Sequence, residues 1–322
     1  MHSVKSLADR LSKEVSLIDL SQENPRELYE PISYIMNLGG KRVRPLLTLL
    51  AAQLFTEKLD SFYKPALAIE LFHNFSLIHD DIMDKAPIRR GKPTVHEKWN
   101  NNTAILSGDV MLVKVYDYLL ALDDSLLRKA MMAFNKCAAN VCEGQQLDVN
   151  FETEDGITEE QYLEMIKLKT AVLLGFSLEF GGMLAMTTQA NQDLLRSVGI
   201  NIGVGFQLKD DLLDAFGDQE KFGKKPGGDI IAKKKTFLLI KAFENAKGDD
   251  LKKLTALMQQ PNESTVKEVT ALYEKLGVKK AAEEKVNYYF NEGFKALNKI
   301  NAPLYKKKML KSFLEQLINR EN

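Results

Sequence analysis

Cysteine is scarce in this sequence, and the only two, Cys137 and Cys142, lie five residues apart in an apolar stretch with no histidine nearby. This pattern provides neither a disulfide framework nor a zinc ligand set, so both are predicted to be reduced thiols of the core. An excess of one charge is also absent, because 44 lysines and arginines balance 44 aspartates and glutamates. Proteins that bind nucleic acid or a membrane surface usually carry a basic excess, so any charged ligand here must be bound by local groups.

Long hydrophobic runs are missing as well. The first ten residues carry Lys5, Asp9 and Arg10 with no apolar stretch behind them, so no secretory signal is predicted. No window approaches the length of a transmembrane segment. We therefore expect a cytoplasmic protein.

The alternation of apolar and polar residues that is typical of β-strands is not sustained anywhere, so the sequence offers no material for a sheet. Nearly every longer segment instead repeats its apolar positions at three and four residues, as in 104–120. Segments 69–84, 171–185 and 198–216 are apolar around too much of their circumference for surface helices. We predict an all-α fold with buried central helices, formed by residues 1–322 as a single domain.

Two aspartate clusters share one spacing, D-D-x-x-D, at Asp80–Asp84 and Asp210–Asp214. Each ends an apolar helical segment and opens a loop with glycine and proline. On a helix, the first and fifth residues lie on one face with Cβ atoms roughly 5–6 Å apart, so their like charges repel. A divalent cation relieves this repulsion, and magnesium in particular prefers oxygen ligands that it shares with substrate phosphates. The alternative is a solvated acidic helix end, which explains one such cluster better than two.

A magnesium–phosphate site also needs cations for the phosphate oxygens that the metal leaves free, and the planar fork of arginine suits them better than lysine does. The sequence offers candidates in four places: Gly39–Pro45 (G-G-K-R-V-R-P), Arg89–Thr94, Lys169-Thr170, and Lys224, Lys225 and Lys233–Lys235. Ordinary basic turns, solvated charge runs and a snorkelling lysine are the alternatives. Of the histidines near the first cluster, His73 and His79, we favour His73 as a ligand contact.

Together these motifs resemble the trans-isoprenyl diphosphate synthase family, which includes farnesyl, geranylgeranyl and longer polyprenyl diphosphate synthases. The resemblance runs from Gly39 to about Thr236 and also includes Arg89-Arg90, Phe206-Gln207, Lys224 and Lys234. It implies an all-α bundle of antiparallel helices around a deep central cavity, usually as a homodimer. It further implies a magnesium-dependent prenyltransferase that joins isopentenyl diphosphate to an allylic diphosphate.

The resemblance also implies a role for each matched residue. The metal ligands, for three magnesium ions that bridge the allylic diphosphate, are Asp80, Asp84 and Asp210, with Asp81 and Asp214 nearby. The cations on the allylic diphosphate are Arg89, Lys169, Lys224 and Lys234. Isopentenyl diphosphate is bound without metal by Lys41, Arg44, His73 and Arg90. The allylic carbocation is shielded by Thr170 and Gln207, and the departing pyrophosphate is the expected base. Lysine pairs and triplets in the basic flap leave its phosphate contact uncertain by one position.

Product length is expected to depend on the side chains one turn before Asp80, because the prenyl tail grows along the helix beneath the first motif. These are Phe75 and Ser76. An aromatic residue followed by a small one resembles family members that stop at fifteen or twenty carbons. Two bulky residues would have favoured fifteen, so the sequence favours geranylgeranyl diphosphate, with farnesyl diphosphate next.

Three other functions remain as alternatives. A terpene cyclase shares the first D-D-x-x-D, but its second metal site resembles N-D-x-x-S-x-x-x-E rather than the cluster at Asp210–Asp214. An HD-type metal phosphohydrolase is suggested by His73 with His79-Asp80, and it leaves the second cluster and Gly39–Pro45 unexplained. A non-catalytic subunit of a heteromeric synthase would be favoured by loss of either motif, and both are present.

Overall fold

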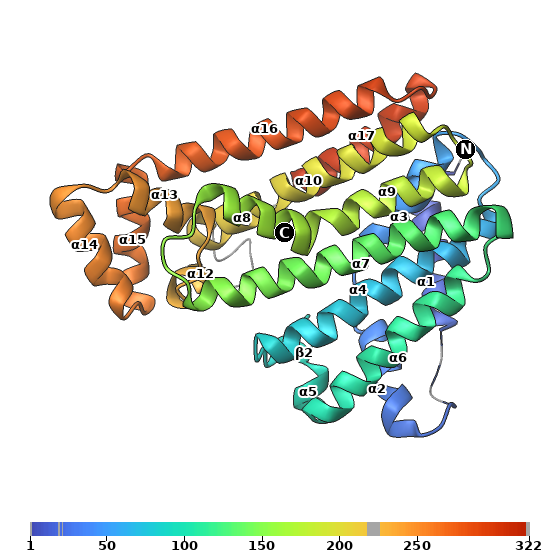
Figure 1. The fold of residues 1–322 in the computed structure, drawn as a ribbon, viewed down its shortest axis with the longest axis horizontal. Coiled ribbons are helices and arrows are strands. Elements are labelled where there is room, and N and C mark those ends of the chain that lie inside the picture. Colours follow the sequence, from blue (N-terminus) through green and yellow to red (C-terminus); the bar gives the residue numbers. More distant parts are fainter. Residues whose placement is uncertain (1, 19, 21, 218–225, 320–322) are drawn as a thin grey trace. The chain divides into compact units, whose positions relative to one another are not determined.

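The computed structural model describes residues 2–18, 20, 22–217 and 226–319. Regular structure in these residues is almost entirely helical, which confirms the predicted all-α fold (Figure 1). The exception among them is a short antiparallel hairpin of β1 (Ile88–Arg89) and β2 (Lys92–Pro93), in the loop that follows the first aspartate cluster. Arg90 and Gly91, both with positive φ, form its turn.

The helices group into two compact units. The first contains the described residues of 1–135, 176–195 and 301–310, and the second contains those of 136–175, 196–300 and 311–322. Several boundaries fall inside continuous helices, namely α7 (Asp124–Thr153), α9 (Val172–Leu184), α10 (Gln189–Phe216) and α17 (Leu304–Ile318). The single domain expected from the sequence stays a prediction.

The first unit is built around α4 (Tyr63–Met83), which packs against α3 and α6. Residues 65–72 of α4 are all buried, so this part of the helix is covered on every side. The prediction for 69–84 is confirmed only up to Phe72, because the later part of the segment includes partly and fully exposed residues. The other elements of the unit are α1 (Val4–Ser16), α2 (Arg26–Asn37), α3 (Val43–Gln53), the 3-10 turn Asp60–Phe62, α5 (Val95–Lys98) and α6 (Asn101–Leu119), with parts of α7, α9, α10 and α17.

A chain of phenylalanine rings fills the core of this unit. Phe72 lies 5.5 Å from Phe75 and 5.2 Å from Phe134, measured between ring centroids, and Phe134 lies 6.0 Å from Phe176. Ring pairs at these separations add to the free energy gained from burial. The rings come from α4, α7 and α9, so the aromatic cluster that contains Phe75 is built from three helices.

The second unit contains the described elements that follow Asn135, apart from those of the first. They are α8 (Glu159–Ile166), the π-helical turn Lys167–Ala171, α12 (Gly228–Ile231), α13 (Phe237–Asn245), α14 (Gly248–Gln259), α15 (Glu263–Lys275) and α16 (Val278–Lys299), with parts of α7, α9, α10 and α17. Residues 202–205 of α10 are all buried, but Asp210 is exposed and 212–214 are partly exposed, so the inner helix predicted over 198–216 is confirmed for only part of its length.

Two further expectations can be compared with the described residues. Cys137 is buried, but Cys142 is exposed, so the prediction of two core thiols is wrong for Cys142. The two residues are five positions apart, and this spacing places them on different faces of α7. None of the helices in the described part of the chain combines the length and the apolar character that crossing a bilayer requires.

Candidate active site

The first aspartate cluster forms the C-terminal end of α4. Asp84 caps the helix, and its backbone N–H donates to the carbonyl oxygen of Asp80 at 2.8 Å. Asp80 is half-buried and Asp84 is exposed, whereas Asp81 is only 1% exposed. The first and fifth carboxylates therefore reach the surface of the first unit, and the second lies in its interior.

Arg89 of β1 binds the buried carboxylate of Asp81 as a fork. Its Nε donates to both Asp81 oxygens at 2.9 and 2.8 Å, and its Nη2 donates to Oδ1 at 2.6 Å. The same Nη2 lies 3.8 Å from Asp80 Oδ2. Burial opposes the charged guanidinium, but Asp81 outweighs burial and raises the pKa of Arg89 above its ordinary value. A fixed positive charge thus stands beside the cluster.

The second cluster, near the C-terminal end of α10, repeats this division in the second unit. Asp210 is exposed and Asp214 is partly exposed, whereas Asp211 is 3% exposed. The Tyr162 hydroxyl donates to Asp211 Oδ2, and Gln207 Nε2 donates to Asp211 Oδ1 at 3.3 Å. Burial raises the pKa of Asp211 to about 7, although both donors and the charge of Lys234 oppose the shift.

Asp214 holds the start of the segment that follows the second cluster. Its Oδ2 accepts a hydrogen bond from the backbone N–H of Asp229 at 2.8 Å, in the first turn of α12. The lysines beyond α12 are held in different ways. Lys233 Nζ donates to the Gln259 carbonyl and Lys235 Nζ donates to the Glu154 carbonyl, whereas Lys234 acts electrostatically on Asp211. The other flap lysine of the predicted site, Lys224, lies outside the described residues.

Lys169 and Thr170 lie in the π-helical turn, which follows a helix started by a capping box of Thr158 and Gln161. The backbone N–H of Val172 bonds to the carbonyl five residues earlier, so the turn is wider than an α-helix. Such turns are frequent at functional sites. α7 approaches this turn closely, because a Cβ added at Gly144 would lie 2.2 Å from the backbone nitrogen of Lys169.

The Lys169 and Thr170 side chains of this turn are held separately, Lys169 by α7 and Thr170 by the second cluster through Gln207. Lys169 Nζ donates to Asp148 Oδ2 at 2.5 Å. Thr170 Oγ1 donates to Gln207 Oε1 at 3.3 Å, and Gln207 in turn donates to Asp211. The amide of Gln207 is therefore held at both ends, with its oxygen directed toward Thr170.

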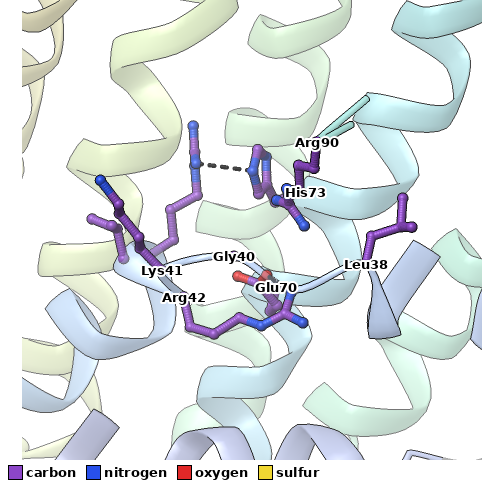
Figure 2. A pocket seen from close by; sticks show the side chains of 9 residues that line it. Leu38, Gly40, Lys41, Arg42, Glu70, His73 and Arg90 are labelled. Atoms are coloured by element: carbon purple, nitrogen blue, oxygen red, sulfur yellow. Dashed lines mark hydrogen bonds and ion pairs between the residues drawn. The ribbon is translucent and has the colours of Figure 1, made fainter. Parts of the chain in front are cut away.

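A basic cavity of about 570 Å³ opens in the first unit (Figure 2). Its charged and polar lining comes from the Gly39–Arg42 loop, the first turn of α3, α4 and the hairpin turn, and comprises Lys41, Arg42, Arg44, Glu70, His73 and Arg90. Arg44 Nη1 lies 3.1 Å from His73 Nε2. Burial, followed by the charges of Arg44 and Arg90, lowers the pKa of His73 well below its usual value. His73 is therefore neutral at pH 7, and its Nε2 accepts from Arg44.

The histidines do not assemble a metal site. His79 Nε2 lies 3.2 Å from the Ile105 carbonyl, while His73 is engaged by Arg44. Within the described residues, no group of three or more histidine, cysteine, aspartate or glutamate side chains is arranged to hold a metal ion. This arrangement does not fit an HD-type phosphohydrolase, which binds its metals through paired histidines and an H-D step.

The polyprenyl synthetase family model matches residues 25–276. The chain belongs to the polyprenyl synthetase family. It is similar to the geranylgeranyl diphosphate synthase of Methanosarcina mazei, with 41% identity over 248 residues that make up 76% of each chain. It is also similar to a short chain isoprenyl diphosphate synthase of Methanothermobacter thermautotrophicus, with 37% identity over 259 residues and 80% of each chain. A solved geranylgeranyl pyrophosphate synthase matches it over the full length of both chains with a TM-score of 0.93 and 41% identity.

This membership confirms the resemblance predicted from the motifs. The protein is a prenyltransferase that elongates all-trans prenyl chains. It has the all-α isoprenoid synthase fold of its structural neighbours. The matched region contains every motif from Gly39 to Thr236 that suggested the family. The terpene cyclase and phosphohydrolase alternatives are therefore set aside.

The structure also identifies neighbours of the site that the sequence did not point to. They are Asp148 beside Lys169, Tyr162 beside Asp211, and Glu70 beside Arg42. Each pair joins residues far apart in sequence. A lone acidic or aromatic residue in a helix carries no pattern, so only the tertiary fold reveals these partners.

The two residues expected to control product length lie on α4, one turn before the first cluster. Phe75 is 9% exposed, and its ring centroid lies 4.7 Å from that of His79. Ser76 is half-buried, and its hydroxyl donates to the His73 carbonyl at 2.8 Å. Phe75 is thus held by packing on both sides, between Phe72 and His79.

Proposed function

We propose that this prenyltransferase condenses isopentenyl diphosphate with an allylic diphosphate in a magnesium-dependent, head-to-tail reaction. Geranylgeranyl diphosphate is the favoured product and farnesyl diphosphate the next. The observation that carries the proposal is the shared construction of the two D-D-x-x-D clusters. In both, the second aspartate is bound by protein groups, while the first and fifth carboxylates reach the surface.

The donor set of the clusters fits magnesium. Asp80 and Asp84 form one pair of hard oxygen ligands, and Asp210 and Asp214 form the other, for three ions in total, with Asp81 adjacent. Neither pair completes a magnesium shell, which suits an ion that also binds water and substrate phosphates. When bound, the metal neutralises the allylic diphosphate and stabilises the pyrophosphate that leaves. The first cluster suits magnesium binding because Arg89 already neutralises the charge of Asp81.

Cations of the protein bind the rest of the allylic diphosphate. Arg89 and Lys169 are both held by carboxylates before substrate arrives, Arg89 by Asp81 and Lys169 by Asp148. Lys224 and Lys234 keep the roles on the allylic diphosphate that their motifs imply, and Lys234 lies close enough to the second cluster to act electrostatically on Asp211. Preorganised charges of this kind stabilise the departing pyrophosphate without reorganisation during the reaction.

Isopentenyl diphosphate binds in the basic cavity, at Lys41, Arg44, His73 and Arg90. Neutral His73 accepts from Arg44 and so leaves the positive charge on the guanidinium, where a phosphate benefits from it. No metal is needed there, because the lining already provides several cations.

We assign two polar oxygens to the stabilisation of the allylic carbocation. The Thr170 hydroxyl and the Gln207 amide oxygen lie 3.3 Å apart, and each presents a partial negative charge. Such dipoles stabilise an allylic carbocation without adding to it, provided that water is excluded. Pyrophosphate takes the final proton, so no side chain is assigned as the base.

The product assignment rests on the position of Phe75. Its buried ring, backed by Phe72 and beyond it Phe134, forms a wall one turn below the first cluster, and Ser76 beside it leaves space. Among the relatives, the Methanosarcina mazei protein is named for geranylgeranyl diphosphate. A twenty-carbon product agrees with both observations.

The proposed assembly is a homodimer. An apolar stripe on and just beyond α6 supports it, because Leu106, Val113 and Leu120 recur every seven residues and are 56%, 60% and 60% exposed. Large apolar side chains that gather on one helix face are typical of interfaces. The cytoplasmic location stays a prediction of the sequence.

The direct test is to incubate the purified protein with isopentenyl diphosphate and each allylic primer, with magnesium or with a chelator. The prenyl alcohols are then identified after dephosphorylation. We expect magnesium-dependent elongation that stops mainly at geranylgeranyl diphosphate. Hydrolysis of the primer alone, or cyclic hydrocarbons, would contradict the assignment, and a complete lack of turnover would favour the non-catalytic subunit of a heteromeric synthase.

A further inference from the structure

Arg42 lies in the middle of the basic motif, but its side chain is directed into the protein. The residue is 9% exposed, and its Nη1 donates to Glu70 Oε1 at 2.6 Å while its Nη2 donates to the Met36 carbonyl. Figure 2 shows the Arg42 side chain running back along the loop to Glu70, whereas Lys41 extends away from it. Glu70 therefore neutralises the Arg42 guanidinium inside the protein.

The backbone at Arg42 has an unusual conformation. Its φ of 45° and ψ of 41° lie in the left-handed region, which L-residues other than glycine rarely adopt. The residue is the N-cap of α3, so this conformation sets the direction in which the helix begins. Such a conformation persists only where the surroundings determine it strongly. The two hydrogen bonds of the guanidinium, to α2 and to α4, provide that constraint.

Glu70 is itself held in place. It is 2% exposed, and the amide of buried Asn74 donates to its Oε1 at 3.1 Å and to its carbonyl at 2.8 Å. Glu70 also belongs to the same helix as His73, one turn earlier. The ion pair therefore ties the loop to the helix that provides another residue of the cavity.

The loop is bound from its other side by Arg90. The Arg90 Nη1 donates to the Gly39 carbonyl, and a Cβ added at Gly40 would lie only 2.9 Å from Arg90 Cζ. The backbone conformation at Gly40, with φ 133°, favours glycine, and a side chain there would displace the Arg90 guanidinium. Arg42 and Arg90 together fix the backbone on either side of Lys41.

We propose that Arg42 is a positioning residue for isopentenyl diphosphate. Through Glu70 and the Met36 carbonyl it holds the loop in the conformation that directs Lys41 and Arg44 toward the diphosphate, and it does not contact the substrate itself. The inference rests on the proposed function, because it deepens the assignment of the basic cavity.

The test compares Arg42→Lys and Glu70→Gln with the wild type. Lysine offers one ammonium and cannot bridge both acceptors, and glutamine keeps the shape of Glu70 without its charge. We expect the KM for isopentenyl diphosphate to rise about tenfold or more, while the KM for the allylic primer changes less than about twofold. KM does not depend on the concentration of folded enzyme, so partial unfolding of a variant leaves this comparison valid.

The matched control is an exposed pair of the same chemistry in α2. Arg26 Nε lies 3.9 Å from Glu30 Oε1, and Arg26→Lys and Glu30→Gln should leave both KM values unchanged. A third variant, Arg42→Gly, tolerates the left-handed backbone but lacks the guanidinium, and it should raise the KM for isopentenyl diphosphate as Arg42→Lys does.

Either of two results would overturn the proposal: an unchanged KM for isopentenyl diphosphate in Glu70→Gln and Arg42→Lys, or an equal rise in both KM values. Lys41→Ala separates this failure from failure of the proposed function. If the wild type elongates primers and Lys41→Ala raises the KM for isopentenyl diphosphate, the cavity assignment stands whatever the Arg42 variants do. If the wild type does not elongate, the proposed function fails first.

Discussion

The ammonium of Lys169 lies 2.5 Å from a carboxylate oxygen of Asp148, a residue of α7 that precedes it by 21 positions. Both side chains are largely buried, at 21% and 16% exposure. The lysine sits in the wide turn that also holds Thr170. Asp148 therefore orients a cation that we assign to the allylic diphosphate, and it keeps that charge partnered when no substrate is bound.

Replacing Asp148 with asparagine should lower kcat/KM for the allylic primer by about tenfold, because a 1 Å displacement of a binding group can cost more than that. Steady-state kinetics with the primer varied at saturating isopentenyl diphosphate measure the effect. Glu164→Gln is the matched control, since Glu164 pairs with Lys167 in the same segment at 2.8 Å but both side chains are exposed. Equal losses in the two variants would show that Asp148 has no special role.

Stability without metal should depend on the protonation of Asp211. Burial raises its pKa from 3.8 to about 7, so the folded protein retains a proton that the unfolded chain has lost. The stability that the protonated Asp211 carboxyl provides is fully present below pH 3.8 and is lost as the pH rises through 7. The free energy of unfolding should fall by at most about 1.4 kcal/mol per pH unit in this range. Denaturant unfolding in chelator between pH 4 and 8 should show this decline.

The variant Asp211→Asn isolates that contribution, because the amide does not titrate. Its free energy of unfolding should depend less on pH than that of the wild type in the same buffer with chelator. Asp249→Asn is the control, since Asp249 is fully exposed and should leave the profile unchanged. An identical pH profile in the wild type and Asp211→Asn would contradict the role of burial at this carboxylate.

Substitutions of the first and second aspartates of the first cluster should have different effects. Asp80→Asn should reduce kcat by about 100-fold or more and raise the magnesium concentration needed for half-maximal activity, since it removes a proposed metal ligand. Asp81→Asn should instead lower the free energy of unfolding by about 3 kcal/mol, because it leaves Arg89 without its buried partner. Magnesium titration and denaturant unfolding of both variants distinguish the two effects. The prediction fails if Asp81→Asn shifts the magnesium requirement as strongly as Asp80→Asn does.

Product length should increase when the Phe75 ring is removed. Phe75→Ala opens the wall below the first cluster, so we expect products beyond twenty carbons, identified as prenyl alcohols after dephosphorylation. The substitution also costs about 3–5 kcal/mol of stability, so the assay belongs at low temperature. Phe243→Ala is the control, because Phe243 is 39% exposed and in the other unit. An unchanged product distribution would show that residues other than Phe75 limit the length of the product.

Much of the fold and site could be predicted because periodicity and motif spacing are local. The inner helices show apolar residues around their whole circumference, and 65–72 of α4 are indeed all buried. The interactions that orient the site were not predictable in this way. The partner of Lys169 is 21 residues away, and that of Tyr162 is 49 residues away, so both depend on how helices pack.

The basic motif likewise depends on contacts that its sequence could not predict. The letters G-G-K-R-V-R-P predicted a group of cations, but they did not show that Arg42 is directed inward, because its guanidinium is held by tertiary contacts with Glu70 and the Met36 carbonyl. In the flap, the run Lys233–Lys235 left the phosphate contact uncertain by one position. Lys233 and Lys235 each donate to a backbone carbonyl distant in sequence, and no sequence pattern encodes those contacts.

The burial of Asp81 and Asp211 divides each aspartate motif into two kinds of position. The second aspartate is buried against protein groups, and the first and fifth are the metal ligands that we propose. In the first cluster, gene duplicates of this chain that abandoned catalysis would thus be free to change the first and fifth positions, while the second would stay under selection for folding. A motif degraded at its ends but intact at its second position would mark a descendant that survives as a binding partner rather than as an enzyme.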